Sequence, residues 1–163
     1  MYETYALFRD KKKRGAIVSN NSGITALYLP EKRKAVLRKI SRDFKGAVPD
    51  KKGHAAAVKL LEDYFSGRGR NGFAGLRLNP GIFKNFTGKV LKRTLKIPYG
   101  ETRSYKWAGF GKARAAGGAL GRNPVPVIIP CHRVIASGGS PGGYTPGLRW
   151  KLRLLKLEQD CKL

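Results

Sequence analysis

The sequence predicts an α/β (α+β) protein, in which a small N-terminal mixed α/β domain precedes a C-terminal helical domain with a helix-turn-helix and a cysteine site. Three observations support this. Strand-like alternation of apolar residues is clearest at the beginning of the chain, and helical periodicity dominates most of the rest. The stretch 66–75 (SGRGRNGFAG) is rich in glycine and basic, which is typical of a turn or linker. We therefore predict domains at 1–78 and 79–163.

The N-terminal domain is expected to contain a hairpin and two helices. Residues 2–8 alternate and predict a first strand, and residues 15–30 hold two β-type runs around Asn20-Asn21-Ser22-Gly23, which is a hairpin signal. Helical spacing follows over 31–44 and again over 53–67. The apolar faces of these two helices are Val36, Leu37, Ile40 and Phe44, and then Ala57, Val58, Leu61, Tyr64 and Phe65.

The C-terminal domain begins with a turn signal and a helix that ends near Pro98-Tyr99-Gly100. Ser104 is expected to cap a short helix, and an alanine-rich helix follows over about 112–120 after a turn at Gly109 and Gly111. Two short helices about a tight glycine turn are typical of a helix-turn-helix. The pattern alone fits an ordinary helical hairpin equally well, and the net charge of the chain favours the DNA-binding alternative.

The charge of the chain favours nucleic acid as the partner. Thirty-four Lys and Arg against ten Asp and Glu give a net charge of +24, spread over the whole chain of 163 residues. Excess charge alone selects no partner, but a folded basic surface of this strength is typical of a nucleic-acid-binding protein. No apolar run approaches the roughly 18 residues of a membrane span, and no signal peptide is evident. We predict a cytoplasmic, nucleoid-associated protein, or a nuclear one in a eukaryote, with no membrane partner.

Cys131 lies next to His132 and Arg133, between an apolar, proline-containing run that we expect to be extended (123–130) and a glycine-rich loop (136–147). An imidazole and a cation are the groups that favour a reactive thiolate. The alternative is a cysteine buried as a small apolar residue. Adjacent side chains of an extended chain point to opposite sides, so His132 would need a bridging water or a turn to reach the sulfur.

A carboxylate would have to orient such a histidine, and the C-terminal segment offers Glu158 and Asp160. This segment alternates like a strand over 148–154, but its Leu, Lys and Arg content favours a helix. The two cysteines, Cys131 and Cys161, argue against a disulfide framework. We predict no metal site, because Cys131 and His132 are adjacent and no Cys-x-x-Cys pair exists, and we expect His54 on the surface.

The stretch NPVPVIIPCHRVIASGG, with the following GGYTPGL, closely resembles the active-site segment of the O6-alkylguanine-DNA alkyltransferases. The resemblance extends over PYGETRSY, ARAAGGALGRNPVP and the C-terminal helix, and so covers most of 81–158; residues 1–78 match the family only in plan. It implies irreversible, single-turnover transfer of an alkyl group from O6-alkylguanine in duplex DNA to Cys131, after nucleotide flipping. It also implies a monomer that needs no cofactor.

The resemblance implies a role for each matching residue. Cys131 would be the alkyl acceptor, deprotonated through a water by His132, which Glu158 orients. Asn123 would hydrogen-bond near the cysteine, and Tyr105 would assist departure of the guanine. The residues implied in substrate binding are Val134, Tyr144, Thr145 and Lys151. Those implied in DNA binding are Lys112, Arg114, Ala115, Gly117, Arg122 and Arg133, of which Arg114 would fill the gap left by the flipped nucleotide.

Two features depart from the family pattern. The segment from Tyr105 to Arg114 is several residues short, and Pro146 stands where glycine is common, which should stiffen the pocket loop. Two other functions remain open: a DNA-binding protein that marks lesions without transfer, and a thiol hydrolase that uses Cys131, His132 and Glu158. The range of alkyl groups, and whether O4-alkylthymine is a substrate, also remain open.

Overall fold

The structure is a computed structural model that describes residues 2–69 and 72–160. Cys161 lies outside the described residues. The chain divides into two units, Met1–Pro80 and Gly81–Leu163, and the predicted boundary lies two residues before this division. The first unit contains most of the sheet structure and the second most of the helices, so the predicted α+β fold class is confirmed.

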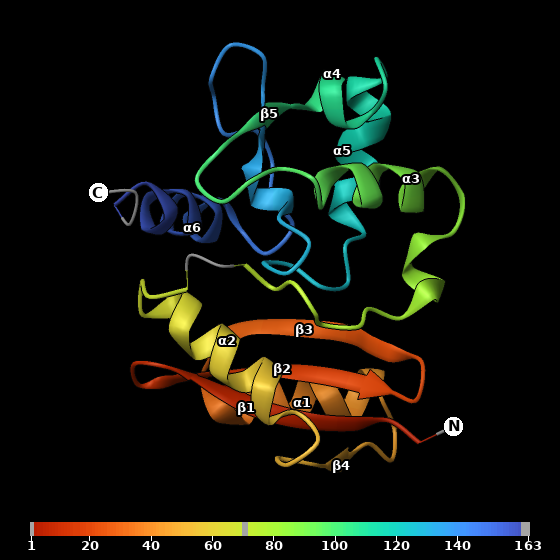
Figure 1. The fold of residues 1–163 in the computed structure, drawn as a ribbon, viewed down its shortest axis with the longest axis vertical. Helices are drawn as coiled ribbons and strands as arrows, with labels where there is room; N and C mark the ends of the chain where they lie inside the picture. The colour runs from red at the N-terminus through yellow and green to blue at the C-terminus, as the bar shows by residue number, and fades with distance from the viewer. Residues whose placement is uncertain (1, 70–71, 161–163) are drawn as a thin grey trace. The chain divides into compact units, whose positions relative to one another are not determined.

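A four-stranded sheet forms the centre of the first unit (Figure 1). Its strands are β1 (Thr4–Asp10), β2 (Lys13–Asn20), β3 (Gly23–Glu31) and β4 (Val48–Pro49), in the order β3-β2-β1-β4. The predicted hairpin is confirmed, because β2 and β3 pair antiparallel with Asn20 opposite Gly23, whose φ of 125° suits glycine. The short β4, which we did not predict, pairs parallel with β1.

One helix covers each face of this sheet, α1 (Arg33–Asp43) behind it and α2 (Ala55–Phe65) in front (Figure 1). Most residues of the predicted apolar faces are buried, and the other three are half-buried: Leu37, Phe44 and Val58. Val36 and Ile40 of α1 belong to a cluster with Ala16, Val18 and Ala26 of the sheet. On the other face, Phe65 of α2 stacks on Phe8, with ring centroids 5.6 Å apart. Each such buried side chain contributes about 1.5–3 kcal/mol to folding.

His54 was predicted to lie on the surface, and this was wrong. The side chain is buried at 5% exposure, with Nε2 2.8 Å from the Ser19 hydroxyl and Nδ1 2.7 Å from the Asp50 carbonyl oxygen. Both ring nitrogens therefore have partners, which is the condition for burying a polar side chain. His54 is a structural residue at the start of α2.

The second unit consists of short elements joined by turns. In chain order these are η1 (Pro80–Phe83, at the junction), α3 (Asn85–Thr94), β5 (Arg103–Ser104), α4 (Tyr105–Ala108), α5 (Ala113–Gly121), η2 (Cys131–Arg133), β6 (Val134–Ile135) and α6 (Leu148–Asp160). The prediction that the C-terminal segment is a helix is confirmed by α6. Strands β5 and β6 pair parallel. Among the described residues, no helix is long and apolar enough to cross a membrane.

The helix-turn-helix consists of α4, a tight turn and α5. Its first helix is a single turn, and the Ser104 hydroxyl accepts a hydrogen bond from the Trp107 amide as the predicted cap (3.1 Å). The Arg93 guanidinium of α3 lies 4.5 Å from the Trp107 ring centroid and 4.3 Å from that of Phe110. Such stacking stabilises a helix too short to hold itself by backbone hydrogen bonds. It explains how the shortened segment keeps a defined geometry.

The apolar run at 123–130 is not the extended segment that the sequence predicted. It is a series of turns in which the Ile129 amide donates to the Val125 carbonyl (2.9 Å) and Val127 has a φ of 75°. Prolines at 124, 126 and 130 remove the amide donors that a strand would need. A β-branched residue at positive φ is strained, and this strain lies four residues before Cys131.

Candidate active site

Cys131 lies beside a cavity of about 570 Å³ in the second unit. This volume is in the range of pockets that bind small molecules or single nucleotides. The walls come from α4, α5 and the glycine-rich loop, and they include Tyr105, Arg114, Gly117, Asn123, Cys131, Tyr144, Thr145 and Pro146. The fold therefore brings six residues predicted to form the site together around Cys131, although they span more than forty positions of the chain. Pro146 lies in the same wall.

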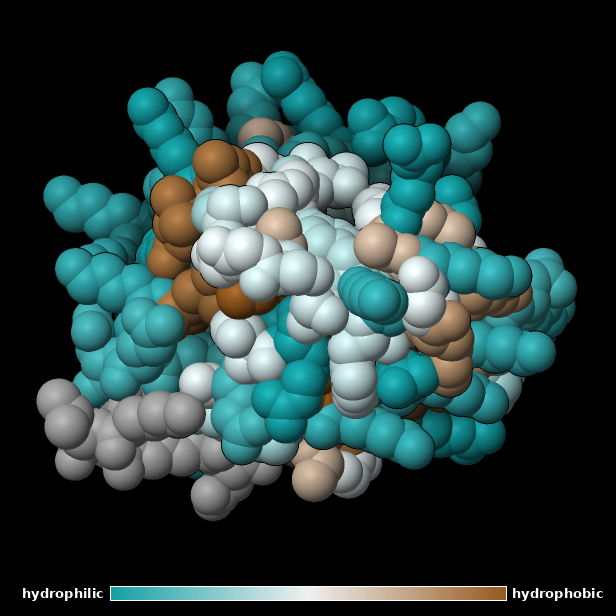
Figure 2. Space-filling view, turned by 90° about the horizontal axis from the view of Figure 1, so that it is seen from above, coloured by the Kyte–Doolittle hydropathy of each residue, from teal (hydrophilic) through white to brown (hydrophobic). Residues whose placement is uncertain are grey.

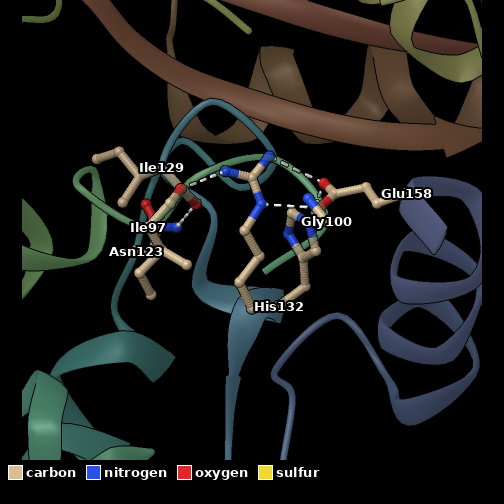
Figure 3. Close-up of polar contacts among 7 residues, drawn as sticks. Ile97, Gly100, Asn123, Ile129, His132 and Glu158 are labelled. Carbon is tan, nitrogen blue, oxygen red and sulfur yellow. Dashed lines mark hydrogen bonds and ion pairs between the residues drawn. The ribbon is translucent and has the colours of Figure 1, made fainter. Parts of the chain in front are cut away.

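Asn123 connects the end of α5 to the cysteine. Its side-chain amide donates to the Cys131 sulfur (3.0 Å) and to the Ile129 carbonyl (2.9 Å), while its own oxygen accepts from the Val125 amide (3.0 Å). Figure 3 shows Asn123 beside Ile129. These three hydrogen bonds hold the turn at 123–130 and fix the sulfur relative to α5.

A buried network connects the neighbouring histidine to α6. His132 Nε2 lies 2.7 Å from Glu158 Oε1, and both side chains are at most 1% exposed. Glu158 reaches from α6 toward His132, and its other oxygen accepts from the Gly100 amide (3.0 Å) (Figure 3). The residue order Lys151, Leu154 and Glu158 places all three on the buried face of α6. Of the two candidate carboxylates, the structure selects Glu158.

Arg133 belongs to this network and not to the DNA-binding surface, which corrects its assignment to DNA. It is 6% exposed, and its Nε and Nη2 donate to the two oxygens of Glu158 (2.8 and 3.0 Å). Nη1 donates to the Ile97 carbonyl (2.7 Å). A buried carboxylate needs such paired charge, and a bidentate guanidinium supplies it. The sequence offered no sign that this one arginine, among many, would be internal.

The electrostatics of the site favour a neutral pair rather than a preformed thiolate. Burial raises the pKa of the Cys131 thiol, although the hydrogen bond from Asn123 acts against it. Burial also lowers the pKa of His132, despite the opposing effect of Glu158. Our expectation that neighbouring groups favour the thiolate was therefore wrong for the resting protein. The thiol must lose its proton as it reacts, and a neutral imidazole is the form that can accept it.

Stability should fall when the solution is acidified. Burial would raise the pKa of Glu158, but hydrogen bonds from His132 and Arg133 outweigh it and hold that pKa well below its usual range. Both His132 and Glu158 thus bind protons more readily in the unfolded chain, so the free energy of unfolding decreases as pH falls. We expect the melting temperature to drop from about pH 6.5 downward, and further below about pH 4.3. A melting temperature independent of pH between 8 and 4 would contradict this network.

A second buried cation braces the glycine-rich loop. Lys151 Nζ is fully buried and donates to the Val134 carbonyl (2.6 Å), the Gly143 carbonyl (3.3 Å) and the Tyr105 hydroxyl (3.2 Å). The Tyr105 hydroxyl in turn donates to the Gly143 carbonyl (3.0 Å). Burial lowers the pKa of Lys151 to about 8, so the Lys151 ammonium can release and regain a proton near neutral pH.

The residues of α5 are mostly small, Ala and Gly, as the sequence predicted. Lys112, Arg114, Ala115 and Arg122 are exposed, and Gly117 is half-buried. Arg114 and Gly117 line the cavity, whereas Arg122 donates to the Thr87 hydroxyl (2.9 Å). Viewed from the end that carries α4 and the loop, the face has a pale, weakly polar centre, bordered on one side by a hydrophobic patch and elsewhere mostly by hydrophilic side chains (Figure 2). A surface of this kind allows close approach of a polyanion to the cavity.

Comparisons with known proteins agree with this geometry. Residues 85–160 match the family model described as the DNA-binding domain of 6-O-methylguanine DNA methyltransferase. The chain is 45% identical over 118 residues to a methylated-DNA–protein-cysteine methyltransferase of Methanosarcina barkeri, covering 69% of this chain and 73% of that protein. It is 42% identical over 119 residues to one of Mycobacterium leprae, covering 70% of each. A Mycobacterium tuberculosis OGT solved in complex with DNA superposes with a TM-score of 0.73 at 32% identity, over 99% of this chain and 94% of that one.

Proposed function

The chain belongs to the methylated-DNA–protein-cysteine methyltransferase family, which repairs DNA by direct alkyl transfer, and from this we propose that Cys131 is the alkyl acceptor. The observation that supports the assignment is the position of its sulfur: at the wall of the cavity, hydrogen-bonded by Asn123, and next in sequence to a buried histidine–carboxylate pair.

The lesion must first leave the helix, because an alkyl group on a stacked guanine is out of reach of a cavity in a protein. Arg114 stands at the rim of the cavity and would fill the gap that the nucleotide leaves. The exposed residues Lys112, Ala115 and Arg122, with Gly117, would make the remaining contacts of α5 with DNA, mostly to phosphates and without sequence preference.

In the chemical step, the Cys131 sulfur attacks the alkyl carbon. A sulfur–carbon bond forms and the bond from that carbon to guanine O6 breaks. The thiol proton passes to Nδ1 of His132, directly or through a water, since Nε2 is engaged with Glu158. Stabilisation of the resulting imidazolium by the carboxylate is the role of the buried pair.

The departing guanine takes a proton, which Tyr105 is placed to donate at the wall of the cavity. Lys151, hydrogen-bonded to the Tyr105 hydroxyl, would replenish that proton. Tyr144, Thr145 and the Val134 carbonyl would hold the base, and the second lone pair of that carbonyl remains for the guanine amine while Lys151 uses the first. The product is a thioether, which no group of this site can cleave, so each molecule reacts once.

We also propose that residues 79–163 form the DNA-binding and alkyl-acceptor domain and that residues 1–78 form a separate N-terminal domain. Every residue that lines the cavity belongs to the unit Gly81–Leu163, which supports this division of roles. A protein that repairs DNA is expected to work where the DNA is, in the nucleoid of a bacterium or archaeon or in a nucleus.

Intact-mass measurement tests the proposal. After incubation with a duplex that carries one O6-methylguanine, we expect the mass of the protein to increase by one methyl group, located on Cys131 by peptide mapping. A second addition of methylated duplex should remain unrepaired. An unchanged mass with retained binding would indicate a lesion-binding protein, and repeated turnover of a thioester substrate would indicate a hydrolase.

A further inference from the structure

Helix α1 of the first unit presents a cluster of cations that the alkyl-transfer site does not use. Arg33, Lys34 and Arg38 are exposed and line one shallow depression, with Leu37 and Ser41 between them. We call these three cations the α1 basic face. Lys32 and Lys45, both exposed, extend the positive charge beyond both ends of the depression.

This arrangement opposes the stability of the helix itself. The first turn of a helix favours acidic residues because of the helix dipole, and α1 has none there while carrying Arg33 and Lys34. Lys34 and Arg38 are four residues apart, so two like charges are neighbours on the helix surface, which is also unfavourable. The stability of the helix therefore does not explain the cluster, whereas a function in binding an anionic partner does.

The other cations of α1 show the contrast. Lys39 pairs with Glu31, and Arg42 pairs with Asp43, whose pKa is lowered mainly by that hydrogen bond. On α2, the exposed Lys59 pairs with Asp63. No ion pair is found for Arg33, Lys34 or Arg38 among residues 2–69 and 72–160. Within α1, the cations without an ion pair are thus the three that line the depression.

We propose that the α1 basic face binds the phosphate backbone of DNA, as a second contact separate from the alkyl-transfer site. Three cations within two helical turns span the distance of a few successive phosphates, since a helix rises about 1.5 Å per residue and phosphates of one strand about 3.4 Å. Between these cations, the apolar side chain of Leu37 suits contact with a sugar, and the Ser41 hydroxyl suits a hydrogen bond to a phosphate oxygen. The choice of DNA rather than another polyanion rests on the proposed function. The presence of the three unpaired cations at the depression does not depend on that function.

The test compares two variants of the full chain with equal loss of charge. R33Q/K34Q/R38Q removes the α1 basic face, and K11Q/K12Q/K51Q removes three exposed lysines from turns of the same unit. Glutamine is a good helix former, so the first variant should remain folded, which a thermal melt checks. Binding to an unmodified duplex is followed by fluorescence anisotropy over a range of salt concentrations.

We expect the α1 variant to bind about tenfold or more weakly near 0.1 M salt, with a slope of log K against log salt shallower by about 2–3, because three phosphate contacts are lost. The control variant should change both quantities much less. If the face contacts a second duplex, the loss instead appears in the co-precipitation of two differently labelled duplexes by one protein. Both results support the proposal.

Equal behaviour of the two variants in both assays would overturn it, because net charge alone would then explain the binding. The rate of alkyl transfer at saturating methylated duplex should be unchanged in both variants, since neither touches the cavity. Because the binding assays use unmodified DNA, they remain decisive even if transfer to Cys131 fails to occur.

Discussion

The Cys131→Ser variant is expected to lose alkyl transfer entirely, by more than about 10³-fold, while it still binds duplex DNA. A serine hydroxyl is far less acidic and less nucleophilic than a thiol, and the buried imidazole cannot compensate for that difference. DNA affinity should persist because the exposed cations lie on other residues. Transfer is measured by intact mass and binding by anisotropy, each with the same methylated duplex.

The only other cysteine of the chain supplies the matched control. Cys161→Ser should accept one methyl group at the wild-type rate. Methylation of Cys131→Ser at any residue, or loss of its DNA binding with the fold intact, would contradict the separation of the alkyl acceptor from the phosphate contacts.

Replacement of Glu158 by glutamine should damage both stability and rate. The buried Arg133 guanidinium loses its counter-charge, which costs about 3–5 kcal/mol. For a domain of this size, we expect the melting temperature to fall by about 10 °C or more. His132 also loses the carboxylate that fixes its tautomer and stabilises its protonated form, so the single-turnover rate constant should fall by about 10²–10⁴-fold.

A second substitution separates the two effects. In Glu158→Gln/Arg133→Met neither member of the buried Glu158–Arg133 ion pair remains charged, so much of the stability should return while the rate stays low. Glu101→Gln is the surface control, because Glu101 pairs with Arg103 at 40% side-chain exposure for both, where an ion pair contributes at most about 1 kcal/mol. Recovery of the rate together with stability in the double variant would show that Glu158 has only a structural role.

Much of the fold was predictable because its signals are local. The hairpin depends on a turn of Asn, Ser and Gly residues, and α1 and α2 depend on apolar spacing. The cap of α4 depends on Ser104, which lies three residues before the Trp107 amide that it accepts from. The short strands β4, β5 and β6 have only two residues each, and nothing in two residues distinguishes a strand from a loop. Their existence depends on a partner strand distant in the chain.

The sequence by itself, through its residue types and the family resemblance, predicted Cys131, His132 and Glu158 as the reactive group, the base and its carboxylate, without reference to distance. Only the tertiary structure decided their surroundings. It showed that Cys131–Arg133 form a 3-10 helix, that Arg133 is internal, and that burial raises the pKa of the Cys131 thiol. The physical reason is that burial and pKa depend on neighbours brought from other elements, such as Ile97, Lys151 and α6, and no local pattern records which of many basic side chains will be enclosed.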